Sequence, residues 1–400
     1  MRLEMGTQMY QWASDLFPIC RSLSGQGVRD TLKYIQNRLP KLSCHEIPSG
    51  SKVLDWIVPD EWNIRDAYVM DEAGNRIIDF QKNNLHVLGY SEPVDTTLSF
   101  SELDAHLHSL PEQEDAIPYI TSYYQRRWGF CLSETQRCEL RKKPDAKYKV
   151  KIDSTLAPGV LNYGELIIPG DTDEEVFFST YICHPSMANN ELSGPVLAMA
   201  LATYLQKLEK RRYTYRIIFI PETIGAIAYL DQHLAHLKSK VIAGFVLSCV
   251  GDNRTYSYVP SRLGNTFADR VATQVLAHHY PNYKKYSYLD RGSDERQYCS
   301  PGADLPVCVI CRSKYGEYPE YHTSLDDLSL ISEEGLEGSF DLYQQCIDAL
   351  EANKTYKATV IGEAQLGRRG LYPSLSTKET AAQVRTLTNI LAYCDGKHDI

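Results

Sequence analysis

The chain has 400 residues, of which 43% are hydrophobic and 23% are charged, and its formal net charge is −9. This composition is that of an ordinary globular protein, long enough for two or three domains. The acidic balance argues against binding nucleic acid through the phosphate backbone, and no apolar run approaches the roughly 20 residues of a membrane span. The first 23 residues lack the apolar core of a secretory signal. We therefore expect a cytoplasmic protein with no membrane or nucleic-acid partner, whose 11 cysteines are reduced.

In the N-terminal third of the chain, the residue pattern changes near residue 55. Helical periodicity over residues 5–16 and 28–39 comes first, and a block of short strand-like runs separated by turns follows over residues 55–137. We interpret this block as a small β-rich inserted domain. Its short strands are expected at residues 55–62, 67–70, 76–80 and 85–88. Its aromatic residues either cover a substrate site or fill the insertion's own core; they are Trp56, Trp62, Tyr123, Tyr124 and Trp128.

After the insertion, strand-like runs alternate with helical ones, which predicts an α/β domain with helices on the faces of a sheet. The strands are expected at residues 160–168, 175–182, 215–220, 243–249 and 307–311. The main domain is then discontinuous and consists of residues 1–54 and 138–355. Residues 356–400 form a separate C-terminal segment with a helix near residues 377–393.

The most informative segment begins where the second of these strands ends. His184 follows the strand, and Asn190 and Glu191 precede a long helical run. Open α/β sheets bind ligands at the carboxyl edge of their strands, so these side chains are candidates for a metal site. The neighbouring Cys183 is expected to point to the opposite face, as successive residues of a strand do. Cys308-Val-Ile-Cys311 lies in an apolar run and predicts buried strand cysteines, not a zinc or redox pair.

Two later segments carry further candidates. Glu222 is the first charged residue after the next strand; it either accepts a proton from an attacking water or is a helix N-terminal acid favoured by the dipole. Ser293-Asp294 comes later, and Tyr321-His322-Thr323 lies in a polar loop with Asp326 four residues after the histidine. Loops that follow strands commonly carry functional groups.

Taken together, these segments resemble the zinc-dependent aminopeptidases, whose relatives include glutaminyl cyclases, over about residues 160–330. The wider chain resembles a bacterial subgroup of cytoplasmic proteins that have an aminopeptidase-like domain and are linked to polysaccharide biosynthesis. The resemblance implies a three-layer α/β/α fold with a mixed central sheet, as in zinc exopeptidases. It also implies that residues 356–400 begin a winged helix.

By the same resemblance, His184 and His322 are metal ligands, Glu222 is the catalytic base, and Asp294 shapes the site. Other positions depart from the family pattern. Asn190 stands where a bridging Asp is expected, and Thr223, Ser248 and Ser186 also replace acids.

Because a catalytic zinc ion needs about three protein ligands and one open position, these departures favour one zinc ion over two. His184, His322 and either Glu191 or Asp252 would complete such a site. Glu191 is equally typical of a helix start, and Asp252 of a plain turn. The remaining candidates for the wall of the site are Asn190, Asp294, Tyr321 and Asp326, and Arg21 and Arg291 are candidates to meet a substrate carboxylate.

Three functions are compatible with these residues. The first is a metal-dependent hydrolase that cleaves an amide or peptide bond of a small-molecule or peptide substrate. The second is a single-metal acyl or cyclisation transferase of the glutaminyl-cyclase type. The third is a non-catalytic aminopeptidase-like binding module. A retained Glu222 favours catalysis, whereas the lost acids favour the second and third functions. The sequence predicts neither the substrate nor the oligomeric state.

Overall fold

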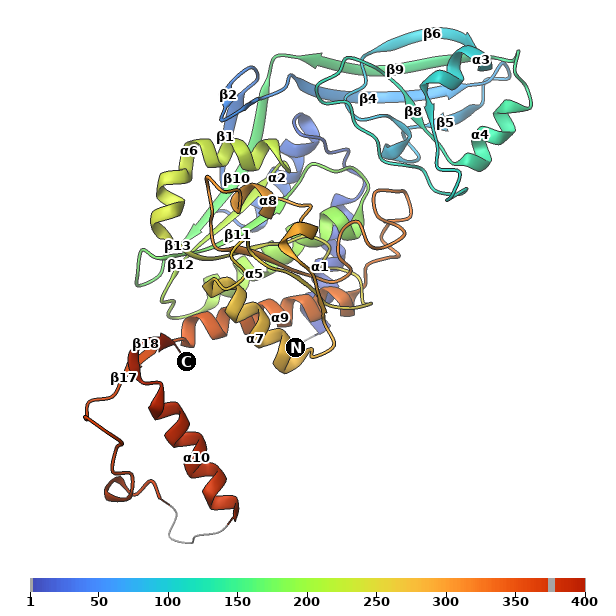
Figure 1. Cartoon of the computed structure of the whole chain (residues 1–400). Coiled ribbons are helices and arrows are strands. Elements are labelled where there is room, and N and C mark those ends of the chain that lie inside the picture. The colour runs from blue at the N-terminus through green and yellow to red at the C-terminus, as the bar shows by residue number, and fades with distance from the viewer. Residues whose placement is uncertain (1–2, 373–377, 400) are drawn as a thin grey trace. The chain divides into compact units, whose positions relative to one another are not determined.

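The computed structural model describes residues 3–372 and 378–399, and the chain divides into two compact units, Met1–Cys346 and Ile347–Ile400. The first unit contains an eight-stranded mixed sheet (Figure 1). In spatial order its strands are β1 (Ser43–Pro48), β10 (Val160–Ile168), β12 (Thr214–Ile220), β11 (Glu175–Tyr181), β13 (Val241–Val246), β16 (Val307–Cys311), β14 (Ser257–Val259) and β15 (Lys284–Lys285). The four central strands β12, β11, β13 and β16 are parallel to one another.

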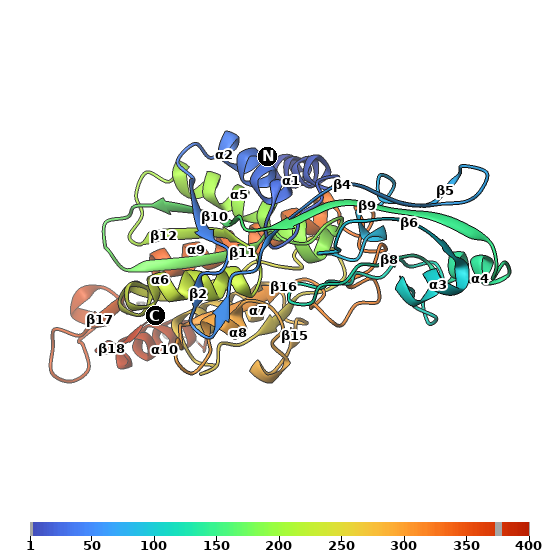
Figure 2. The same ribbon diagram turned by 90° about the horizontal axis from the view of Figure 1, so that it is seen from above.

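Helices cover both faces of this sheet. Figure 2 shows α1 (Leu3–Leu16), α2 (Gln26–Arg38) and α5 (Ser193–Lys207) on one face. Helices α6 (Ile224–Lys240) and α8 (Glu295–Tyr298) lie on the other face. Helix α7 (Phe267–His279) lies on the first face, where the Tyr258 hydroxyl of β14 donates to its Asp269. Strands β11 and β16 are buried along their whole length, as expected for parallel strands covered on both sides. This arrangement confirms the predicted three-layer fold.

The aromatic core shows how the layers are held together. Phe177 of β11 packs against Tyr229 of α6 and Tyr298 of α8. The next residue, Phe178, packs against Tyr343 of α9 (Glu333–Ala352). Because side chains alternate along a strand, these two rings serve opposite faces of the sheet. Cys308 and Cys311 lie buried in β16, as the sequence predicts.

A second sheet belongs to the inserted part of the chain. Its strands are β5 (Arg76–Asp79), β4 (Glu61–Met70), β9 (Lys147–Ala157) and β6 (Val94–Ser99), in that spatial order. Shorter elements accompany it: β2 (Lys52–Val53), β3 (Trp56–Ile57), α3 (Phe100–Leu103), β7 (Leu107–His108), β8 (Phe130–Cys131) and α4 (Glu134–Arg141). The second sheet therefore extends to Ala157, beyond the predicted limit at residue 137, because β9 pairs with both β4 and β6.

Two other boundaries differ from the sequence-based expectation. Residues 85–88 were expected as a strand, but Asn84–His86 form a 3-10 helix whose first turn is capped by the Asn83 side chain. Strand β13 ends at Val246, so residues 247–249 leave the sheet and enter the site described below. Among the described residues, no helix is long and apolar enough to cross a membrane.

The second unit contains β17 (Thr355–Lys357) and β18 (Asp395–Asp399), which pair in antiparallel fashion. Between them in sequence lie a 3-10 turn (Gly367–Arg369) and helix α10 (Lys378–Ala392). The predicted helix at residues 377–393 is confirmed as α10, except that residue 377 lies outside the described residues.

Candidate functional site

The candidate site lies where neighbouring parallel strands end. Strands β12, β11 and β13 are adjacent, so the segments that follow Tyr181, Ile220 and Val246 emerge at one edge of the sheet. His184 comes from the first of these segments, and His322 comes from the loop that follows β16. Their ring centroids are 5.3 Å apart. The fold therefore brings together the two predicted metal histidines.

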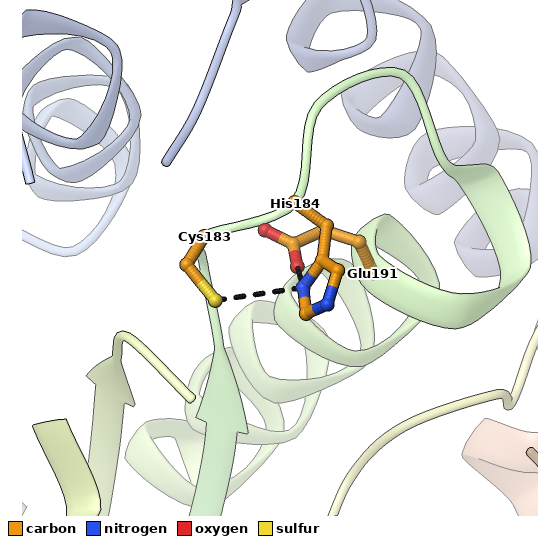
Figure 3. Close-up of side chains that lie close together, drawn as sticks. All are labelled: Cys183, His184 and Glu191. Atoms are coloured by element: carbon orange, nitrogen blue, oxygen red, sulfur yellow. Dashed lines mark hydrogen bonds and ion pairs between the residues drawn. The ribbon is translucent and has the colours of Figure 1, made fainter. Parts of the chain in front are cut away.

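His184 is held between two acids. Its Nδ1 lies 2.9 Å from Glu191 Oε2 (Figure 3), and its Nε2 lies 3.7 Å from Glu222 Oε2. Because a carboxylate accepts hydrogen bonds, Nδ1 donates to Glu191, and Nε2 is the ring nitrogen directed toward Glu222. Burial lowers the pKa of His184, but the hydrogen bond and charge of Glu191 outweigh it, so the pKa lies above its ordinary value.

Cys183 does not point away from His184, so that prediction is wrong. Its Sγ lies 3.4 Å from His184 Nδ1, on the same side of the chain (Figure 3). Strand β11 ends at Tyr181, so strand alternation no longer applies at these two residues. Within the described part of the chain, Cys183, His184 and Glu191 form the one group of three ligand atoms that lie within 4.8 Å of one another. Burial raises the pKa of the Cys183 thiol well above its usual range, which keeps it protonated.

Glu191 is fully buried and pairs with an equally buried arginine. Arg21 Nε lies 3.3 Å from Glu191 Oε1, and both side chains are inaccessible to solvent. Arg21 also donates hydrogen bonds to the carbonyl oxygens of His184 and Leu16, at 3.1 and 2.8 Å. Arg21 therefore supports Glu191, and the expectation that it meets a substrate carboxylate is wrong. Arg291 instead lies over the ring of Tyr288.

Asn190 and Glu191 belong to a short π-helix, Ala188–Leu192, which Asp326 anchors. The Asp326 carboxylate accepts hydrogen bonds from the backbone N–H groups of Asn189 and Asn190, at 2.6 and 3.0 Å, and from the Tyr318 hydroxyl at 2.8 Å. Burial raises the pKa of Asp326 to about 6, although these hydrogen bonds oppose the change. π-helical turns are common at functional sites.

Asp252 has other partners. Its Oδ2 accepts hydrogen bonds from Asn189 Nδ2 and the Ser313 backbone N–H, at 3.0 and 2.8 Å. Its Oδ1 accepts from the Ser313 hydroxyl and the Arg254 backbone N–H, both at 2.9 Å. The carboxylate thus joins three loops, and the structure does not bring it into a ligand group with the two histidines among the residues described.

A neutral network occupies positions where the resemblance leads one to expect acids. Asn190 Nδ2 donates to the Tyr181 hydroxyl at 3.0 Å, and this hydroxyl also bonds the Ser248 hydroxyl. Asn190 Oδ1 is buried and has no hydrogen-bond partner among the described residues. The network therefore supplies one free acceptor and no negative charge.

His322 also presents an unpaired atom. Its Nε2 is buried and lacks a hydrogen-bond partner in residues 3–372 and 378–399. Burial, together with the charge of His184, lowers the pKa of His322 to about 3, so the ring is neutral. The ring stacks on Tyr321 with centroids 3.9 Å apart, and Tyr119, from the inserted part of the chain, meets it edge-on at 5.3 Å.

Strained backbone is concentrated around the site. Ser186, Thr223, Cys249 and His322 all have positive φ, between 46° and 63°. Such residues cost about 1–3 kcal/mol each and commonly mark functional sites. The strain at Thr223 is held by Asp294, whose Oδ1 accepts from the Thr223 N–H at 2.8 Å, and this turn sets the direction of Glu222.

Glu222 lies at a cavity of about 290 Å³. Burial raises the pKa of its carboxyl, while His184 and Arg296 oppose the change. The residues lining the cavity are Leu23, Trp56, Tyr123, Tyr124, Cys183, His184, Glu222, Thr223 and Ile224. Three of the five aromatic residues named from the sequence are therefore at the site. The other two do not line the cavity: Trp62 is buried in the insertion and stacks on Tyr90, and the half-buried Trp128 stacks on His106.

Comparison with known proteins agrees with this architecture. Residues 10–353 match the family model described as a domain of unknown function, DUF4910. The chain belongs to this family. Residues 354–400 match a winged helix-turn-helix model, which confirms the winged-helix expectation for the C-terminal segment.

Two relatives from Clostridium acetobutylicum are similar along most of the chain. One, described as a candidate polysaccharide biosynthesis protein with an aminopeptidase-like domain, is 45% identical over 370 residues, covering 92% of this chain and 84% of the relative. The other is a crystal structure of a candidate peptidase with 42% identity and a TM-score of 0.91, covering 100% of this chain and 90% of that one.

More distant structures share the fold. A zinc aminopeptidase from Bacillus subtilis has a TM-score of 0.59 at 14% identity, over 86% of this chain and 94% of its own. A glutaminyl cyclase from an Acidobacteriales bacterium has a TM-score of 0.50 at 12% identity, also over 86% and 94%. These similarities confirm the predicted aminopeptidase-like fold.

Proposed function

We propose that the protein is a metal-dependent hydrolase of an amide or peptide bond, with one zinc ion bound by His184 and His322. The observation that carries this proposal is the buried, unpaired Nε2 of His322 beside His184. A buried polar atom without a partner costs about 1–3 kcal/mol, and ligation of a metal ion would remove this cost. The name of the zinc aminopeptidase that shares the fold supports the choice of metal.

The donor set fits a zinc ion. With both rings neutral, His184 Nε2 and His322 Nε2 would supply two ligands and the unpaired Asn190 Oδ1 a third, while Glu191 stays bonded to Nδ1 on the other side of the His184 ring. Zinc sites with three protein ligands leave one position open for water or substrate. A bound zinc ion would polarise the substrate carbonyl and lower the pKa of water. In this proposal Asp252 stays a loop anchor, because all its partners are already in place.

The remaining residues have distinct roles in this proposal. Glu222 is the general base and accepts the proton that water loses on attack; its raised pKa makes it a stronger base than an ordinary carboxylate. Glu191 fixes the ring of His184 through Nδ1, as carboxylates commonly do for metal-binding histidines. Arg21 balances the charge of Glu191. Asp294 holds the strained Thr223 turn and so orients Glu222.

One ion is favoured over two because the neutral network of Asn190, Tyr181 and Ser248 provides no second set of anionic ligands. This same feature favours a second candidate function. Glutaminyl cyclases share the fold, and intramolecular transfer to the substrate's own amine would use the same base and histidines.

We also infer a cytoplasmic location and a small-molecule or peptide substrate. All eleven cysteines are free thiols, as a reducing compartment requires.

The test compares the zinc-loaded chain with Glu222→Gln on a panel of amides and N-terminal glutaminyl peptides. The proposal predicts hydrolysis by the parent and a loss of roughly 100- to 10,000-fold in Glu222→Gln at unchanged zinc content. Glu317→Gln, which changes an exposed acid, is the matched control and should behave as the parent. Cyclisation without hydrolysis would select the second function. Full activity in Glu222→Gln, or no turnover of any amide or glutaminyl peptide, would contradict the proposal.

A further inference from the structure

The inserted domain is fastened directly to the loop that carries His322. The backbone N–H of Tyr119 donates to the His322 carbonyl at 2.9 Å, and the N–H of Ser324 donates to the Ile117 carbonyl at 2.9 Å. A β-bridge joins Pro118 and Thr323 between these bonds. The insertion therefore keeps a fixed position beside the candidate metal site.

Tyr119 brings the insertion into contact with both histidines. Its ring lies 5.2 Å from His184 and 5.3 Å from His322, measured between centroids. Its hydroxyl lies 2.9 Å from the hydroxyl of Tyr123, which lines the cavity. This hydrogen bond engages the Tyr123 hydroxyl, so the phenol ring contributes chiefly apolar surface to the wall.

Aromatic residues of the insertion line the same cavity as Glu222 and form its aromatic wall. Trp56 lies in the hairpin of β2 and β3, and its ring is 6.0 Å from that of Tyr124 at an angle of 59°. The Tyr124 hydroxyl donates to the Ile57 carbonyl at 3.2 Å and so ties the hairpin to the loop of residues 121–127. Leu23 completes this apolar side of the cavity.

The aromatic wall continues outward onto the surface. Trp56 is 39% exposed and Tyr124 is 55% exposed, and Leu54 and Ile57 of the same hairpin are exposed by 48% and 58%. A contiguous exposed apolar patch of this kind commonly marks a binding surface. Trp56 and Tyr124 belong both to this patch and to the lining of the cavity that Glu222 and His184 share, so one ligand could contact both surfaces.

Charge and size restrict what the cavity accepts. Among the described lining residues there is no lysine or arginine, and Glu222 is the one carboxylate. A carboxylate against this wall would lose its hydration without gaining a partner, and an ammonium group would find only aromatic faces and the Glu222 carboxylate that the proposed reaction uses. The volume of about 290 Å³ lies at the small end of ligand pockets, so it suits one residue-sized group.

We propose that Trp56, Tyr123 and Tyr124 form a recognition pocket for an uncharged, apolar or aromatic group adjacent to the scissile amide. This inference rests on the proposed function, since the reacting amide lies between the aromatic wall and Glu222. The inserted domain then selects the substrate, and the aminopeptidase-like domain supplies the chemistry.

The first experiment measures binding. Amino-acid amides of phenylalanine, leucine, alanine, glutamate and lysine are titrated calorimetrically into the zinc-supplied full chain. The proposal predicts that phenylalaninamide and leucinamide bind roughly 10- to 100-fold more tightly than the other three. Trp56→Ala and Tyr124→Ala should reduce this preference to within about threefold. Leu289→Ala is the matched control, because it removes an apolar side chain that is 79% exposed and does not line the cavity.

The second experiment repeats the comparison with the p-nitroanilides of the same amino acids and measures kcat/KM. Selective binding without turnover would support this pocket while contradicting the proposed hydrolase. Turnover of all five anilides at similar kcat/KM would overturn the pocket while leaving the hydrolase intact. Absence of amide binding, or an unchanged preference in both Trp56→Ala and Tyr124→Ala, would also overturn it. Circular dichroism of each variant shows whether the fold is retained.

Discussion

Replacing Arg21 by methionine tests whether the buried ion pair with Glu191 supports the candidate site. Arg21 is 1% exposed and makes hydrogen bonds to Glu191, to the His184 carbonyl and to the Leu16 carbonyl. Methionine preserves much of the apolar stem but leaves the Glu191 carboxylate buried without its cation. Removing one partner of a buried pair costs about 3–5 kcal/mol.

The magnitude converts into a shift in melting temperature. For the unit Met1–Cys346, the unfolding entropy is about 0.7 kcal/mol/K, so Arg21→Met should lower Tm by about 4–7 °C. Urea unfolding measures the free energy directly. The double variant Arg21→Met/Glu191→Gln should recover part of the loss, because the glutamine carries no charge and its oxygen still accepts from His184 Nδ1.

Arg254→Met is the matched control. Arg254 makes a bidentate pair with Glu320, at 2.8 and 2.9 Å, but its side chain is 47% exposed. An exposed pair of this kind contributes at most about 1 kcal/mol. If Arg21→Met destabilises the protein no more than Arg254→Met does, the buried pair does not have the role assigned to it here.

Three further predictions concern other parts of the molecule. Burial alone would raise the pKa of Glu61, but hydrogen bonds, first of all from Arg29 at 2.7 Å, lower it to about 2. This stabilisation is present above the unfolded pKa of about 4.5 and is lost as pH falls toward 2. Glu61→Gln should therefore lower the free energy of unfolding in urea by about 1–2 kcal/mol at pH 7 and by less at pH 4. A difference between parent and variant that grows as pH falls would contradict this prediction. The double variant Asn190→Asp/Ser248→Asp should bind a second zinc ion per chain, measured by elemental analysis, and an unchanged stoichiometry would refute the role given to the neutral network. Asp326→Ala should lower the free energy of unfolding by about 3 kcal/mol and accelerate hydrogen exchange of the Asn190 amide. Asp326→Asn keeps one acceptor and should lower the free energy by less. Equal protection of this amide in the parent and in Asp326→Ala would show that Asp326 does not anchor the π-helix.

The sequence was informative wherever a strong periodic pattern agreed with the tertiary structure. Strands β10 and β16 occupy the predicted residues, because long apolar runs have few alternatives to burial in a sheet covered on both sides. His184, Glu222 and His322 were identifiable because each follows a strand, and parallel strands deliver such residues to one edge.

Other features of the site cannot be predicted from the neighbouring residues in the sequence. Cys183 was misplaced because strand alternation was extended two residues past the end of β11. The positive φ of Thr223 and His322 depends on bonds to Asp294 and Tyr119, which lie far away in sequence. Arg21 gave no sign of being the partner of Glu191, since a single arginine is usually a surface residue.

Zinc content shows whether His184 and His322 hold a metal ion. The full chain is purified without chelator and supplied with zinc, and bound zinc is measured for the parent, His184→Ala and His322→Ala. His86→Ala is the control, because His86 is buried outside the site and bonds the Cys131 carbonyl. We expect about one tightly bound zinc ion per chain, lost in both site variants and kept in the control. A parent that binds no zinc, or zinc retained in both site variants, would contradict this expectation.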